Sequence, residues 1–177
     1  WLGKHYSEFY GPLRLLTSYL FLGGLGAALA GLMSWVLLPQ LWGHLPQDRG
    51  RAYAVESKES EGKPVGAGGI FIPVFLLVCL LVLPLDLRFL EVLSCVLLAM
   101  LVGFFDDRSN SGWSEYRMGA LDVCISLLGA TVICQLDSYD LWLPLAKTPV
   151  SVPPLIFIPA AAMLIWIAIN ATNCTDG

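Results

Sequence analysis

The fold is decided by the segment LLTSYLFLGGLGAALAGLMSWVLL, residues 15–38, which contains no charged side chain. A helix of about 20 apolar residues crosses the ~30 Å hydrocarbon core of a bilayer. Four glycines within the segment favour the close approach of a second helix. The segment therefore predicts a transmembrane helix that packs tightly against a neighbour.

Four further apolar runs of helix length follow it, and they predict spans at about residues 69–85, 87–105, 119–136 and 152–171. None alternates between apolar and polar residues, so a β-barrel is not indicated. We expect an all-α, polytopic membrane helix bundle with five transmembrane helices, forming a single integral-membrane domain over residues 1–177.

The composition agrees with this expectation. Hydrophobic residues make up 56% of the chain and charged residues 14%, with a mean hydropathy of +0.70. Soluble domains carry about 25% charged residues, so a water-soluble globule is excluded, as is intrinsic disorder. A net charge of −4 without a basic stripe argues against nucleic-acid binding.

Five spans would place the loops 39–68 and 106–118 and the C-terminal end on one side of the membrane. That side carries six basic residues: Arg49, Arg51, Lys58, Lys63, Arg108 and Arg117. The other side carries four: Lys4, Arg14, Arg88 and Lys147. The positive-inside rule then predicts that the loops are cytoplasmic and that the N-terminus lies outside.

Three polar clusters on the cytoplasmic side need an explanation beyond membrane insertion. The first is ESKESEGKPVGAGG, residues 56–69, in which Lys58 and Lys63 precede Gly68 and Gly69. Glycines expose backbone N–H groups, and such groups at a helix N-terminus bind anions. The alternative interpretation is a flexible charged loop that ends at a helix.

The second cluster is the pair Asp106–Asp107 at the end of the third predicted span. Neighbouring carboxylates can bind Mg²⁺ through hard oxygen ligands or supply a general base. Negative charge at a helix C-terminus opposes the helix dipole, so the pair is not explained by local stability. The alternative is a solvated helix end.

The third cluster is NATNCTDG, residues 170–177, which gathers Asn170, Asn173 and Asp176 within about two turns. Amides with a carboxylate can bind the edge of a base or complete a metal shell, whereas the alternative is a helix C-cap. Together, a basic glycine loop, an acid pair and an Asn/Asp end on one membrane face suit Mg²⁺-assisted handling of a phosphate.

The order of these motifs resembles that of the polyprenyl-phosphate N-acetylhexosamine-1-phosphate transferases. The matching segments are Ser57-Lys58 with residues 62–69, Gly103-Phe104-Phe105-Asp106-Asp107, and residues 170–177. The Thr175-Asp176-Gly177 ending is similar to the muramoyl-pentapeptide branch rather than the N-acetylglucosamine branch. The resemblance spans the chain and implies that it corresponds to the N-terminal half of a protein with about ten spans.

The resemblance implies an enzyme of the bacterial plasma membrane, with its active site on the cytoplasmic face. It would transfer phospho-N-acetylmuramoyl-pentapeptide from a UDP-linked donor to undecaprenyl phosphate with Mg²⁺, releasing UMP, in peptidoglycan synthesis. A homodimer is also implied.

The same resemblance assigns roles to the motif residues. Asp106 is implied as the base or, in another scheme, the nucleophile. Asp107, with Asp176, is implied as a Mg²⁺ ligand, although the principal ligand would lie in the other half of the protein. Lys58 or Lys63 would neutralise the diphosphate, and Asn170, Asn173 and Asp176 would hold the nucleoside or support the metal.

Two other classes of protein are weighed against this one. An ion-relaying transporter predicts charges at mid-membrane facing a pore, whereas Asp106, Asp107 and Asp176 lie at predicted span ends. A purely structural membrane subunit leaves the acid pair and the glycine loop unexplained.

Overall fold

The computed structural model describes residues 11–47, 62–109, 112–135, 139–142 and 147–175. Five α-helices dominate the described chain, and each coincides with one of the predicted apolar runs. They are α2 (Tyr19–Leu41), α4 (Gly68–Val82), α5 (Leu87–Arg108), α6 (Glu115–Cys134) and α7 (Pro154–Thr175). The 3₁₀ helices η1 (Gly11–Thr17) and η2 (Trp42–His44) flank α2.

Side-chain caps fix where three of the helices begin. Ser18 Oγ accepts the Phe21 N–H before α2, Asp86 Oδ1 accepts the Phe89 N–H before α5, and Ser114 Oγ accepts the Arg117 N–H before α6. Such caps satisfy N–H groups that have no partner within the helix. In contrast, the N-cap of α4 is Ala67, which provides no side-chain cap.

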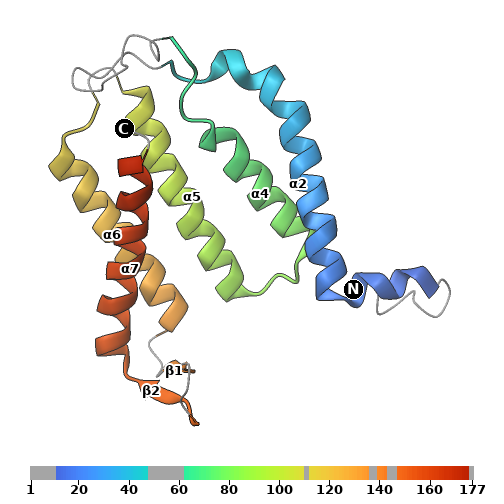
Figure 1. Cartoon of the computed structure of the whole chain (residues 1–177), viewed down its shortest axis with the longest axis vertical. Helices are drawn as coiled ribbons and strands as arrows, with labels where there is room; N and C mark the ends of the chain where they lie inside the picture. Colours follow the sequence, from blue (N-terminus) through green and yellow to red (C-terminus); the bar gives the residue numbers. More distant parts are fainter. Residues whose placement is uncertain (1–10, 48–61, 110–111, 136–138, 143–146, 176–177) are drawn as a thin grey trace.

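The helices run up and down (Figure 1). The ends of α2, α5 and α7 and the starts of α4 and α6 lie together at one end of the bundle. The opposite end holds η1, the α4–α5 turn and a hairpin of β1 (Tyr139–Leu141) and β2 (Val150–Val152), paired antiparallel. This alternation brings the glycine loop, the acid pair and the end of α7 to one end, as the predicted span count requires.

Four of the helices are long and apolar enough to cross a membrane, namely α2, α5, α6 and α7. With 15 residues, α4 is shorter than the predicted span 69–85. At 1.5 Å per residue it extends about 22 Å, less than the hydrocarbon thickness of ~30 Å. The Leu83 N–H still bonds the Cys79 carbonyl, but Leu83 is extended and Pro84 follows, so the helix stops at Val82.

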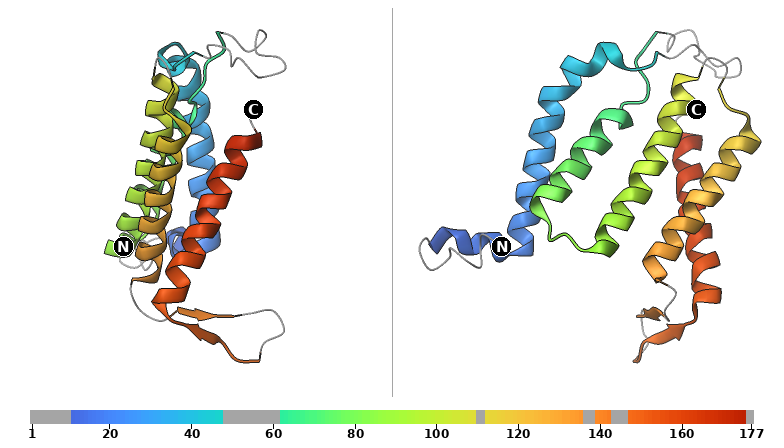
Figure 2. Two further views of the ribbon diagram at one scale, coloured as in Figure 1. Left: turned by 90° about the vertical axis from the view of Figure 1, so that its left-hand side faces the viewer. Right: turned by 180° about the vertical axis from the view of Figure 1, so that it is seen from behind.

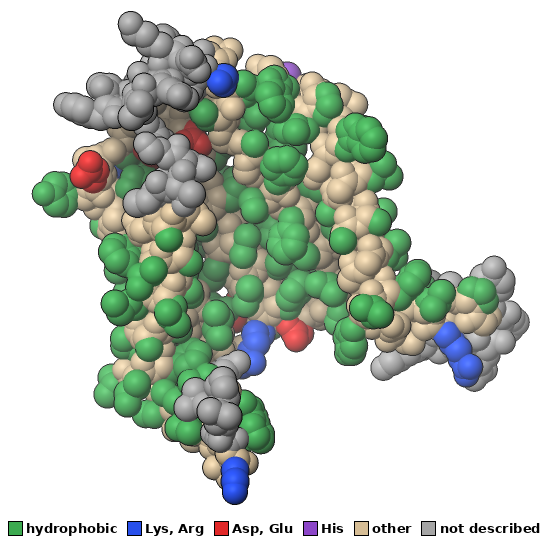
Figure 3. Space-filling view, viewed as in Figure 1, with side chains coloured by type: hydrophobic (Ala, Val, Ile, Leu, Met, Phe, Trp, Pro, Cys, Tyr) green, Lys and Arg blue, Asp and Glu red, His purple; other side chains and the backbone are tan. Residues whose placement is uncertain are grey.

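Apolar side chains cover the outside of the bundle rather than a large interior. Leu20 and Leu155 are among many large hydrophobic side chains that stay exposed in the isolated chain. In the space-filling view, the charged side chains of the visible face gather at the two ends and leave an apolar middle band (Figure 3). This surface suits lipid contact.

Two helical glycines inside the bundle face side chains of a neighbouring helix. α7 crosses α6 (Figure 2), and Ile165 Cδ1 of α7 would lie 3.7 Å from a Cβ added at Gly129 of α6. Gly26 of α2 likewise faces Val78 of α4, with 3.6 Å between the added Cβ and Cγ1. The glycine predicted to admit a close helix therefore does so at this position.

The remaining helix boundaries differ from the predicted ones by a few residues. α2 begins at Tyr19 rather than residue 15 because η1 and the Ser18 cap precede it. α6 begins at Glu115 rather than residue 119, and α7 covers 154–175 rather than 152–171. The β1–β2 hairpin was not predicted at all.

Candidate active site

The glycine loop is tied to the chain that follows α2. The Val65 N–H donates to the Pro46 carbonyl at 2.8 Å, and Gln47 forms an antiparallel bridge with Pro64. Gly66 then adopts a left-handed backbone with φ of +72°, a region that L side chains rarely enter. The loop is thereby turned toward the end of α5.

Gly66 lies directly against the acid pair. A Cβ added there would lie 3.2 Å from Oδ2 of Asp107 and 3.5 Å from Cγ of Pro46. The backbone conformation therefore favours glycine at this position, and the space for a side chain is tight. The predicted pairing of the glycine loop with the acid motif is confirmed at this contact.

A second glycine sets the distance between α4 and α5. A Cβ added at Gly69 would lie only 2.8 Å from Cδ2 of Phe104, closer than real Cβ atoms approach other atoms. The neighbouring Gly68 has open space around its Cα. The aromatic ring one turn before the acid pair thus rests on the backbone of the first turn of α4.

Two of the backbone N–H groups at the start of α4 donate to carbonyl groups of the same turn. The Gly69 N–H bonds the Gly66 carbonyl at 2.9 Å, and the Ile70 N–H bonds the Ala67 carbonyl at 2.9 Å. The Gly68 N–H makes no hydrogen bond to any residue that the structure describes. An anion at this helix start would meet that single amide and the positive end of the helix dipole.

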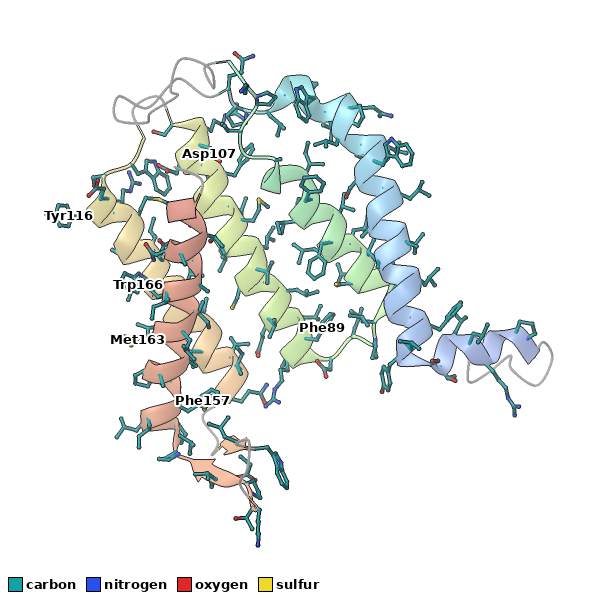
Figure 4. The ribbon with its side chains drawn as sticks, in the orientation of Figure 1. Phe89, Asp107, Tyr116, Phe157, Met163 and Trp166 are labelled. Atoms are coloured by element: carbon teal, nitrogen blue, oxygen red, sulfur yellow. The ribbon has the colours of Figure 1, made fainter. Side chains whose placement is uncertain are left out.

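The two acids point to different surroundings, because successive residues on a helix are turned by about 100°. Asp107, labelled at the upper end of α5 in Figure 4, lines a cavity of about 500 Å³. Asp106 turns toward the α5–α6 connection, where its Oδ1 accepts the Trp113 N–H at 2.7 Å. The Asp106 carbonyl also accepts the Ser109 N–H at 2.9 Å, which closes α5.

The cavity lies among four helices, since α4, α5, α6 and α7 all contribute to its wall. Its lining is apolar along its depth, with residues such as Ile72, Met100 and Ile165, and polar at the end formed by Gly66 and Asp107. Its volume lies within the range of about 300–1,000 Å³ typical of ligand pockets. The arrangement suits a molecule with a charged head and an apolar body.

The third motif reaches the cavity only in part. Ile169 of α7 lines it, and the next residue, Asn170, donates from Nδ2 to the Trp166 carbonyl of its own helix at 2.9 Å. Nothing is described of the Asn173 side chain, and Asp176 lies outside the described residues, as does Lys58. Lys63 is described and solvent-exposed, three residues before Gly66.

The sequence did not predict a role for Trp113. Besides donating its N–H to Asp106, Trp113 carries the Arg117 guanidinium over its indole ring, with Cζ 4.2 Å from the ring centroid. The four-residue spacing of Trp113 and Arg117 is a usable signal for this stacking. The bond from the Trp113 amide to Asp106 depends on the path of the connection and leaves no sequence signal.

A buried polar pair lies apart from the cavity on α6. Asp122 is 6% exposed and Ser126, one turn later, is 1% exposed, and Ser126 Oγ has no hydrogen-bond partner among the described residues. Neither lines the cavity. The sequence shows Asp122 near the start of a span but assigns it no role.

Among the described residues, Asp107 is the one carboxylate that lines the cavity. The described residues contain no group of three or more His, Cys, Asp or Glu that could hold a metal ion by themselves. Mg²⁺ keeps several waters and uses one or two carboxylates together with substrate phosphates. Asp107, at the polar end of the cavity, is the described carboxylate that meets this need.

Comparison with known proteins agrees with the resemblance. The family model described as glycosyl transferase family 4 matches residues 89–177. Two proteins named phospho-N-acetylmuramoyl-pentapeptide-transferase, one from Treponema pallidum subsp. pallidum and one from the Nichols strain of Treponema pallidum, are each 42% identical over 175 residues. These matches cover 96% of this chain and 47% of each relative, so the chain spans about half the length of the curated relatives it matches.

No solved structure gives a significant match. The family model nevertheless covers half of the chain, including α5 from Phe89 onward with its acid pair, all of α6 and all of α7. With several apolar helices of membrane-spanning length, the chain is a multi-pass membrane protein, and it belongs to glycosyl transferase family 4.

Proposed function

We propose that the intact protein transfers phospho-N-acetylmuramoyl-pentapeptide from its UDP-linked donor to undecaprenyl phosphate. The observation that carries the proposal is the cavity, in which Asp107 stands beside Gly66 at the polar end of an apolar chamber. The names of the two relatives, both phospho-N-acetylmuramoyl-pentapeptide-transferase, support the choice of transferred group.

In the proposed reaction, an oxygen of the lipid phosphate attacks the phosphorus that bears the sugar. The new P–O bond forms the lipid-linked diphosphate, while the P–O bond to the uridine monophosphate breaks and UMP leaves with the electron pair. Asp106 takes the proton from the lipid phosphate. Its Oδ1 already accepts the Trp113 N–H, so Oδ2 is the oxygen we assign to the proton.

Asp107 holds the charged head groups at the cavity together with Mg²⁺, and Asp176 is proposed to assist. When bound, the ion neutralises charge that develops on the diphosphate. Either Lys58 or Lys63 contributes a further positive charge, and Asn170 and Asn173 hold the nucleoside. Gly68 keeps the start of α4 open to the phosphate, and Gly69 lets the Phe104 ring pack on the same turn.

We also propose that this end of the bundle faces the cytoplasm of a bacterial cell, with the N-terminus outside, and that the enzyme is a homodimer. The excess of basic residues in the loops of this end supports the orientation. In an assay with sealed vesicles, the UDP-linked donor must therefore be supplied on the side that corresponds to the cytoplasm.

The test is UMP release by the purified intact protein, given UDP-N-acetylmuramoyl-pentapeptide, undecaprenyl phosphate and Mg²⁺. We expect UMP and the lipid-linked diphosphate in equal amounts, and an Asp107→Asn protein with a rate at least about a hundredfold lower. An unchanged rate in that variant contradicts the site assignment. Turnover with UDP-N-acetylglucosamine alone would instead indicate the other branch of the family.

A matched control separates the transferase from an ion-relaying transporter. Asp122 is the acid that lies buried within a described span, seven residues into α6. A transporter would depend on this residue. As a transferase, the Asp122→Asn protein should keep its rate of UMP release per folded molecule.

A further inference from the structure

The connection between α5 and α6 holds the carboxylate of Asp106 by a main-chain amide. The Trp113 N–H reaches back to Oδ1 at 2.7 Å, although seven residues separate the two. A hydrogen bond of this length restrains the rotation of a carboxylate and leaves its second oxygen for another partner.

Three features keep this amide in place. Gly112 has a left-handed backbone, with φ of +66°, immediately before Trp113. Ser114 caps α6 directly after it, accepting the Arg117 N–H at 3.4 Å. The Arg117 guanidinium in turn lies over the half-buried Trp113 ring, 4.2 Å from its centroid. The position of Trp113 is therefore restrained by the turn before it, by the start of α6 after it, and by the stacking of Arg117 on its ring.

We propose that the Trp113 amide is a positioning group for the transfer reaction, because it orients Asp106 so that Oδ2 faces the proton of the lipid phosphate. The inference rests on the proposed function and adds Gly112 and Trp113 to the residues on which its rate depends. Trp113 touches no reacting atom, and its effect passes through Asp106.

The most direct experiment replaces the Trp113 amide by an ester in the intact protein, through incorporation of indole-3-lactic acid at position 113. This change removes one N–H and keeps the side chain. We expect kcat for UMP release to fall about tenfold or more, since small misplacement of a reacting group costs this much or more. KM for the UDP-linked donor should stay within about twofold, because ground-state binding does not use the bond.

The matched control is an ester at position 109. It removes the N–H that bonds the main-chain carbonyl of Asp106, at the same junction, and leaves the carboxylate bond intact. We expect a kcat within about threefold of that of the parent protein. This ester weakens the end of α5 but leaves the Asp106 carboxylate oriented as before. Equal losses from both esters would contradict a specific role for the carboxylate bond.

A double-variant cycle shows whether the amide acts through Asp106. In Asp106→Asn, the side-chain oxygen can still accept the N–H, but the group no longer takes a proton. With radiolabelled donor to measure the residual rate, the ester should cause little further loss in this background. The same fold-loss in both backgrounds would overturn the proposal, as would an ester at 113 that leaves kcat unchanged.

A genetically simpler pair supports the same test if the ester protein is obtained in low yield. Gly112→Ala strains the left-handed turn, whereas Gly119→Ala in α6 meets nothing within 4 Å and has no such backbone. Only the first should lower kcat. A parent protein that releases no UMP at all would refute the proposed function itself, a result distinct from unchanged kcat in these variants.

Discussion

The two ends of the helix bundle are built differently. At one end, the backbone at Gly66 and Gly69 lies against Asp107 and Phe104, and a Cβ added at Gly69 would come within 2.8 Å of the Phe104 ring. At the other end, the Arg88 guanidinium reaches the Gln135 side-chain oxygen across α5 and α6, and a two-stranded hairpin follows. The first end is fixed by backbone contacts, whereas the second is joined by the tips of long side chains.

The two ends should differ in their tolerance of substitution. A side-chain bridge on the surface tolerates substitution because water can replace either partner. Backbone contact with a carboxylate and an aromatic ring tolerates almost none, so it holds a geometry closely. Sensitivity to substitution should follow the same division.

The largest effect is expected at Asp106. Asp106→Asn should lower kcat by about 10²–10⁴-fold, the usual contribution of a general base, and leave donor binding largely intact. Steady-state UMP release and equilibrium binding of the UDP-linked donor measure the two quantities. Equal loss of turnover and binding would contradict the role as a base.

An intermediate effect is expected at Gly69. Gly69→Ala drives a Cβ into the Phe104 ring, and overpacking of this kind costs about 1–3 kcal/mol. Thermal unfolding in detergent should show the loss, and turnover should fall with it. Gly68→Ala, with open space around it, serves as the control and should leave the unfolding midpoint unchanged.

A second substitution sharpens the Gly69 prediction. Phe104→Leu removes the ring atoms that the added methyl group meets, so the double variant should regain stability relative to Gly69→Ala alone. Additive losses would show that the 2.8 Å approach is not what restricts this position.

The lysines of the glycine loop should differ from one another. If one of Lys58 and Lys63 neutralises the diphosphate, only that Lys→Ala change should raise KM for the UDP-linked donor, by about tenfold for the loss of one charged contact. Initial rates over a range of donor concentrations give this value. Negligible effects from both would remove the anion-binding role of the loop.

The smallest effect belongs to the opposite end. Arg88→Ala breaks the exposed hydrogen bond to Gln135, and the net contribution of such a bond is about 0.5–1.5 kcal/mol. Turnover should remain within about twofold of the parent, since this bridge lies at the end of α5 remote from Asp107. A loss as large as that at Gly69 would contradict the division between the two ends.

Much of the fold follows from the sequence, because apolar runs of this length have few alternatives in a bilayer. The five runs became five helices, and their alternation placed the glycine loop beside the acid pair. Helix ends were less accurate, since the Ser18 and Ser114 caps and the extended Leu83 decide them locally.

Other features of the site could not be predicted from the sequence, because they depend on how the helices pack. The partners of Asp106 and Asp107 depend on how α5 is rotated about its own axis. The amide of Trp113 reaches Asp106 only because of the path that the α5–α6 connection takes. The same holds for the burial of Ser126, because a serine within an apolar run carries no sign of what packs on it.

The central claim is that the glycine loop and the end of α5 share one membrane face, and α4 is the element on which it depends, since its 15 residues are fewer than a full span. The most direct measurement is labelling by a membrane-impermeant maleimide of single cysteines at Lys63, Ser109 and Lys147 in sealed vesicles, with the native cysteines removed. We predict that positions 63 and 109 react from the same side and position 147 from the opposite side. Reaction of 63 and 109 from opposite sides would contradict the account, because no shared site would then exist.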